Sequence, residues 1–187
     1  MATVPIEISA RHIHITEADW SALFGDAKIV SDHAISQPGQ FVATRRATLR
    51  GLKGEYAKVG VVGPFRPYTQ VELAASEARH LGIAPPVTDS GKLDKAVAIT
   101  IVGPKGELVR DAAIIQKRHL HCHPDDAKKH GFKDGQLVSA VISGLRGARL
   151  DNVTIRVNKD YSFRLHLDID EGNACGVTPG MTAEVVT

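Results

Sequence analysis

Five of the nine histidines in this chain fall in two short motifs, which read RHIH from position 11 and RHLHCH from position 118. In each motif two histidines are separated by one residue, the spacing that puts two side chains on the same face of a β-strand. Two neighbouring imidazoles supply half of the four-ligand shell that zinc prefers. His12 with His14, and His119 with His121, are therefore candidate metal ligands.

Each histidine pair needs a third ligand, because a zinc site that does chemistry typically has three protein ligands and one open position. A diverged internal repeat indicates where to look, since GLKG at 51–54 matches GLRG at 144–147. A weaker match between YTQVEL and YSFRLHL places Glu72 and His166 at corresponding positions. The repeat therefore predicts two metal-binding triads, which are His12/His14/Glu72 and His119/His121/His166.

Three side chains beside the second motif need a separate interpretation. His123 falls on the same strand face as His121, but Pro124 ends the strand, so we expect His123 to cap a helix or to support the ligands from behind. Cys122 alternates to the opposite face, which argues against a thiolate ligand. Cys175, in EGNACG, is expected to be a small buried residue.

Arg66 follows a strand-like run and the Gly63-Pro64 turn, and it lies shortly before Glu72. A guanidinium on a rigid turn suits bidentate binding of an oxyanion, above all phosphate. A solvent-exposed turn arginine is the plainer interpretation, and the nearby metal candidates favour the anion-binding one. The chain contains no G-x-x-x-x-G-K-[ST], G-x-G-x-x-G or G-x-S-x-G motif, which excludes the familiar nucleotide-loop and serine-hydrolase designs.

Short β-rich runs bounded by Gly, Pro and Asp must position these side chains. The strand-like runs are VPIEIS, QFVATRRATL, AKVGVVG, AVAITIVG, AAIIQK, GQLVSAVISG, NVTIRV, FRLHLDI and TAEVV. Helical stretches are few, chiefly TEADWSALFG with Thr16 as N-cap, SEARHLG, and HPDDAKKHGF with Pro124 in its first turn. The pattern predicts a mainly β protein of two small β-barrels from an internal repeat, each with short capping helices.

Composition narrows the partners. The chain has 187 residues, 5% aromatic residues and a net charge of +2, so neither nucleic acid nor a membrane surface is an expected partner. Two distant cysteines suggest no disulfide framework and fit a reducing cytoplasm. No export signal or long apolar run is visible, so we expect a soluble, cytoplasmic protein.

At these residues the sequence resembles the PduL-type phosphotransacylases, which are phosphate propanoyltransferases found with bacterial microcompartments, including those of propanediol degradation, together with relatives that handle acetyl groups. The matching segments run in order along essentially the whole chain. They are VPIEISARHIHIT with LFG, VGVVGPFRPYTQVE, ITIVGPKG, IIQKRHLHCHPDDAKKHGFKDG, RGARLDNVTIRV and LHLDIDEGNA.

The resemblance implies reversible transfer of a propanoyl or acetyl group between coenzyme A and inorganic phosphate, with acyl-CoA, phosphate and acyl phosphate as substrates and products. It implies two Zn²⁺ ions held by the two triads, and Arg66 as the catalytic residue that binds phosphate. It also implies that residues 1–10 join 117–187 in one barrel, that 11–116 form the other, and that the metal site lies between them. The coenzyme A contacts stay unassigned.

Some features depart from the family pattern or leave alternatives open. Only MAT precedes the first strand, so the N-terminal encapsulation extension of many relatives is not seen, although shell or lumen proteins of a microcompartment remain conceivable partners. Self-association is also left open. HLHCHPDD has some likeness to the H-x-H-x-D-H motif of metallo-β-lactamase-like proteins, so a metal-dependent hydrolase is one alternative. A non-catalytic, metal-stabilised binding module is another.

Overall fold

The computed structural model of the protein describes residues 2–25 and 28–187, and within them it is mainly β. This part of the chain forms two closed six-stranded barrels with four short helices, which confirms the predicted fold class. The chain divides into a C-terminal unit, Met1–Ala10 with Lys117–Thr187, and an N-terminal unit, Arg11–Gln116. None of the described helices has the length and apolar character that crossing a bilayer requires.

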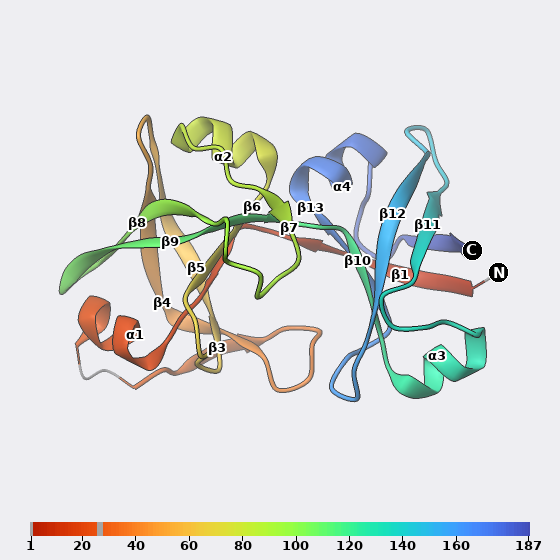
Figure 1. The fold of residues 1–187 in the computed structure, drawn as a ribbon, viewed down its shortest axis with the longest axis horizontal. Helices are drawn as coiled ribbons and strands as arrows, with labels where there is room; N and C mark the ends of the chain where they lie inside the picture. Colours follow the sequence, from red (N-terminus) through yellow and green to blue (C-terminus); the bar gives the residue numbers. More distant parts are fainter. Residues whose placement is uncertain (1, 26–27) are drawn as a thin grey trace. The chain divides into compact units, whose positions relative to one another are not determined.

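The C-terminal unit is built around one barrel that includes the first strand of the chain (Figure 1). Strand β1 lies between β13, its parallel neighbour, and β14, its antiparallel neighbour. Around the barrel the order is β1 (Ala2–Ser9), β13 (Arg164–Asp168), β10 (His119–Cys122), β12 (Ala148–Val157), β11 (Leu137–Ile142) and β14 (Thr182–Val186).

The N-terminal unit repeats this arrangement. Its ring of strands is β9 (Gly106–Gln116), β6 (Gln70–Leu73), β2 (His12–His14), β5 (Glu55–Gly63), β4 (Phe41–Arg50) and β8 (Val97–Gly103), which closes on β9. Two short strands extend the sheet, β3 (Ser31–Ala34) beside β4 and β7 (Val87–Thr88) beside β9.

The pairing pattern demonstrates the internal repeat. Strand β2 pairs in parallel with β5 and antiparallel with β6, and β10 pairs in the same way with β12 and β13. The GLKG and GLRG segments join corresponding strand pairs, β4–β5 and β11–β12. The last strand of each ring, β9 or β1, directly precedes the histidine strand of the other unit. Each barrel is therefore completed by the strand that leads into the histidine strand of the other unit.

Local signals in the sequence explain where the helices begin. The helices are α1 (Glu17–Phe24), α2 (Ala75–Leu81), α3 (Pro124–His130) and α4 (Ile169–Cys175). Thr16 accepts a hydrogen bond from the Asp19 amide at the start of α1, and Pro124 occupies the first turn of α3, both as predicted. Helix α4 was not predicted, although Asp168 and Glu171 form a complete capping box at its start.

Candidate metal centres

The first candidate centre lies on the outer face of the N-terminal barrel. Ile13 is fully buried in the barrel core, so His12 and His14 on either side of it project from the opposite face of β2. On the antiparallel strand β6, Glu72 lies directly opposite His12. The three predicted ligands therefore meet, and each offers one ligand atom within 4.8 Å of the others.

The spacing within this cluster fits a bound cation. The Nε2 atoms of His12 and His14 are 3.1 Å apart, and they lie 3.5 and 3.7 Å from the two carboxylate oxygens of Glu72. Zinc binds nitrogen and carboxylate oxygen at about 2.0–2.2 Å, so the edges of its ligand tetrahedron measure about 3.3–3.6 Å. The donor set of two imidazoles and one carboxylate also suits zinc chemically.

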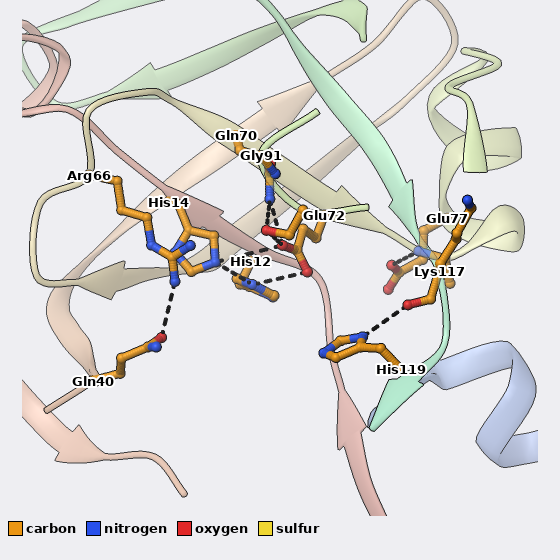
Figure 2. Close-up of polar contacts among 12 residues, drawn as sticks. His12, His14, Gln40, Arg66, Gln70, Glu72, Glu77, Gly91, Lys117 and His119 are labelled. Carbon is orange, nitrogen blue, oxygen red and sulfur yellow. Dashed lines mark hydrogen bonds and ion pairs between the residues drawn. The ribbon is translucent and has the colours of Figure 1, made fainter. Parts of the chain in front are cut away.

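A hydrogen-bond network holds the Glu72 carboxylate from behind (Figure 2). Gln70 is fully buried, and its Nε2 donates to Glu72 Oε1 at 2.6 Å and to Ser90 Oγ at 2.8 Å. Ser90 Oγ donates to the same Glu72 oxygen at 3.1 Å, while the Gly91 amide donates to Gln70 Oε1 at 2.7 Å. The network fixes the orientation of the carboxylate, as hydrogen bonds behind metal ligands do.

The positively charged Arg66 lies close enough to this cluster to affect the pKa of His14. Burial lowers the pKa of His14 well below its usual value, and the nearby charges of His12 and Arg66 lower it further. His14 is therefore neutral at physiological pH, which is the state that binds metal. The backbone amide of Arg66 donates to the Ile15 carbonyl at 2.9 Å, and its guanidinium donates to Gln40 Oε1 at 3.3 Å.

The second candidate centre lies on the outer face of the C-terminal barrel. Leu120 and Cys122 are fully buried in that core, so His119 and His121 point away from it. His166 on β13 lies opposite His119, and the three ligand atoms again lie within 4.8 Å of one another. His119 Nδ1 is 2.9 Å from the Lys117 carbonyl oxygen, an arrangement that leaves Nε2 for a metal.

Comparison with known proteins identifies the family. The family model for phosphate propanoyltransferase matches residues 5–178. The chain belongs to the phosphate propanoyltransferase family. A protein of that name from Rhodobacter capsulatus is 43% identical over 178 residues, covering 94% of this chain and 83% of the relative. Others from Alkaliphilus metalliredigens (43% identical; 98% and 87% covered) and Thermotoga maritima (40%; 97% and 88%) are similar.

In this member of the phosphate propanoyltransferase family, an arginine beside each histidine strand forms an ion pair with a helix. Arg11 Nη1 is 2.6 Å from Glu77 in the first turn of α2, and Arg118 Nε is 2.7 Å from Glu171 in the first turn of α4. Each helix directly follows the strand that carries the third ligand of its cluster. The pairs therefore connect the two strands that supply the ligands in each barrel.

The remaining histidine of RHLHCH is a helix cap. His123 Nδ1 accepts a hydrogen bond from the Asp125 amide at the start of α3, and among the described residues it belongs to neither ligand cluster. Burial raises the pKa of Cys122 to about 11, with help from Asp126. Burial also raises the pKa of the Cys175 thiol. Both cysteines are consequently protonated and unreactive at neutral pH.

Sequence reasoning missed the residues behind the ligands. Gln70 could have been found, because it lies two residues before Glu72 and so shares its strand face. Ser90 and Gly91 gave no signal, since they reach Glu72 and Gln70 from a loop distant in the sequence. Gln40, which orients the Arg66 guanidinium, was missed for the same reason.

Proposed function

We propose that this protein is a phosphate acyltransferase that reversibly moves a short acyl group, propanoyl or acetyl, between coenzyme A and inorganic phosphate. The observation that carries the proposal is the cluster of His12, His14 and Glu72 with the Arg66 charge beside it. A ligand set that leaves room for substrate, next to an oxyanion-binding guanidinium, is what attack by phosphate requires. Membership of the phosphate propanoyltransferase family supports the same reaction.

The two triads are the proposed ligands of two zinc ions, His12/His14/Glu72 for one and His119/His121/His166 for the other. Bound zinc supplies a Lewis acid for the thioester carbonyl and for the departing thiolate. The three-histidine ligand set carries no compensating charge, whereas Glu72 cancels part of the metal charge at the other. A zinc ion held by the three histidines would therefore be the more electrophilic of the two.

Arg66 is the proposed phosphate-binding residue. Its guanidinium is held at Nη2 by Gln40 and at Nη1 by the Tyr68 hydroxyl, 3.4 Å away, so the fork is oriented before substrate arrives. Once phosphate is bound by this guanidinium, a phosphate oxygen attacks the thioester carbon. The new C–O bond forms, and the C–S bond breaks to release coenzyme A thiolate. Orientation of the phosphate is the part of the reaction that we assign to the protein side chains.

No acyl-enzyme is needed in this reaction. The two cysteines of the chain, Cys122 and Cys175, are buried and have raised pKa values, so neither presents a thiolate. The two alternatives, a metal-dependent hydrolase and a non-catalytic module, have no support from the relatives. A purely structural zinc site would also have no use for an anion-binding arginine beside it.

A coupled assay tests the proposal. Acetyl-CoA and propanoyl-CoA are supplied with phosphate, and thiol release is followed before and after chelation and again after zinc is restored. We expect activity that chelation abolishes, zinc restores, and Arg66→Ala reduces by at least about 100-fold. Arg50→Ala is the matched control, because Arg50 pairs with Glu107 on an exposed surface. Absence of activity in the wild type, or activity indifferent to metal, would refute the proposal.

The place of action is the bacterial cytoplasm or the lumen of a microcompartment within it. Immunodetection in purified microcompartments of the source organism would decide between the two, because a cytoplasmic enzyme stays in the soluble fraction. The same material would show whether shell or lumen proteins associate with it.

A further inference from the structure

The two candidate centres sit in the same backbone frame but have different neighbours. In the N-terminal barrel, His14 lies between Val62 on β5 and Gln70 on β6. In the C-terminal barrel, the corresponding His121 lies between Arg156 on β12 and Arg164 on β13. Register neighbours project from the same face of a sheet, so both guanidiniums belong to the face that carries the three histidines.

The alternation of core residues supports this placement. Ile155 and Leu165 are fully buried in the barrel core. In the sequence, Ile155 directly precedes Arg156 and Leu165 directly follows Arg164. Arg156 and Arg164 therefore project outward, and both side chains are only partly exposed. Arg156, His121 and Arg164 therefore lie in one row across β12, β10 and β13, and the two arginines make this row cationic.

Arg156 has no carboxylate partner within the described part of the chain. Its guanidinium carbon lies over the ring of Tyr161, 5.9 Å from the ring centroid. Tyr161 in turn stacks on the His121 ring, with centroids 3.8 Å apart and planes 17° from parallel. The guanidinium thus lies near the three-histidine centre, with Tyr161 between it and His121, and no carboxylate of the described residues neutralises it.

Arg164 is only weakly compensated. Its Nε atom is buried and makes no hydrogen bond, and the ion pair that it forms with Glu7 Oε2 is long, at 3.5 Å. Glu7 is the one acidic residue in the register beside His166, where the N-terminal barrel has Ile114 beside Glu72. Glu7 pairs with Arg164 alone of the two arginines, and the three-histidine ligand set adds no negative charge of its own.

We propose that Arg156 and Arg164 form a second oxyanion subsite beside the three-histidine centre and bind a phosphate group of a substrate. Phosphate fits because guanidinium forks bind it bidentately, and because like charges crowded on one face favour an anion among them. Strands β12 and β13, which carry the two arginines, flank β10 and are about 10 Å apart. Two arginine side chains are long enough to reach one phosphate across that distance. The inference rests on the proposed function, whose substrates supply inorganic phosphate and the phosphate groups of coenzyme A.

The test measures binding as well as turnover on the zinc-loaded protein. Arg156→Ala and Arg164→Ala are compared with wild type for the KM of phosphate, of propanoyl-CoA and of propanoyl-dephospho-CoA, and calorimetry gives Kd for phosphate and coenzyme A. We expect each variant to raise the KM and Kd of one substrate by about 10- to 100-fold. Arg149→Ala is the control, because Arg149 lies on the same strand and is paired with Asp151.

Each outcome has one meaning. A rise confined to phosphate assigns the subsite to inorganic phosphate, and a rise confined to propanoyl-CoA that disappears with the dephospho form assigns it to the 3′-phosphate. A rise that persists with the dephospho form assigns it to the diphosphate. Arg156→Lys, which keeps the charge, should recover part of the affinity. KM and Kd within two-fold of wild type in both variants would overturn the inference while leaving the proposed function intact. An inactive wild type would refute the proposed function, and calorimetry would still test the subsite.

Discussion

Replacement of Gln70 by leucine tests whether the residues that hydrogen-bond to a metal ligand determine the affinity of the site for metal. Gln70 is fully buried, and its amide group bonds to Glu72, Ser90 and Gly91 at 2.6–2.8 Å. Leucine has a similar size but neither donates nor accepts a hydrogen bond. The Gly91 amide then loses its acceptor, and the Glu72 carboxylate loses its shortest hydrogen bond.

Two separate magnitudes follow. Gly91 is exposed, so water can replace the acceptor that its amide loses, and the folding cost falls on the buried Glu72 carboxylate, at about 1–3 kcal/mol. Loss of a hydrogen bond behind a ligand lowers metal affinity about 10- to 100-fold, which corresponds to about 1.4–2.7 kcal/mol. The second effect should be confined to the centre that contains Glu72, because Gln70 has no bond to the other three ligands.

Cobalt titration separates these effects. Metal-free protein is titrated with Co²⁺, and the visible absorption of the bound ion reports each centre, in competition with a chelator. We expect two ions per chain in the wild type and, in Gln70→Leu, one unchanged and one weakened site. The three-histidine centre serves as the internal control. Gln40→Leu is the matched variant, since Gln40 bonds to Arg66 rather than to a ligand.

The reasoning would be refuted by a Gln70→Leu protein that melts at a lower temperature yet binds both ions as tightly as wild type. That result would make Gln70 a packing residue alone. Equal weakening of both centres would also refute it, because the cause would then be a general loss of structure.

Two further predictions concern titratable groups. Burial by itself would raise the pKa of Asp19, but hydrogen bonds from Arg110 and Thr69 lower it below the ordinary 3.8. The stability that this carboxylate contributes is therefore present above about pH 4, and it is lost as the pH falls through the lowered pKa. Asp19→Asn should cost about 1–2 kcal/mol in urea unfolding at pH 7 and much less at pH 3, and an equal cost at both would contradict the assignment. For the thiols, the Cys122→Ala/Cys175→Ala double variant should keep its transfer activity, and mass spectrometry of wild type with propanoyl-CoA but no phosphate should show no acyl adduct. A stable adduct would contradict direct attack by phosphate.

The proximity of the candidate ligands was predictable because strand alternation is a local rule. One intervening residue is enough to place His12 with His14 and His119 with His121. The third ligands required the internal repeat, and the structure brings Glu72 and His166 to the corresponding places opposite the first histidine of each pair.

Other parts were beyond the sequence for physical reasons. Strands β3 and β7 have four and two residues, too few for a periodic pattern to stand out. The contact between Ser90 and Glu72 depends on a loop folding back over β6, which no local pattern encodes. The cationic row of Arg156 and Arg164 became visible only through the strand register, because neither residue belongs to a motif.

Both centres owe their geometry to the barrel cores rather than to the ligands. Ile13 and Leu120, each fully buried, anchor the residue between the paired histidines, and Val71 and Leu165 do the same beside the third ligand. Because these core residues fix the backbone, the two barrels share the same ligand spacing although their outward side chains differ. The two barrels therefore share one backbone arrangement but differ in charge. In one candidate centre the Glu72 carboxylate, supported by Gln70, offsets part of the positive charge, whereas the three-histidine centre is bordered by arginines. If the proposed function holds, we expect the two substrates to divide between the centres, with the more highly charged substrate on the more positive face.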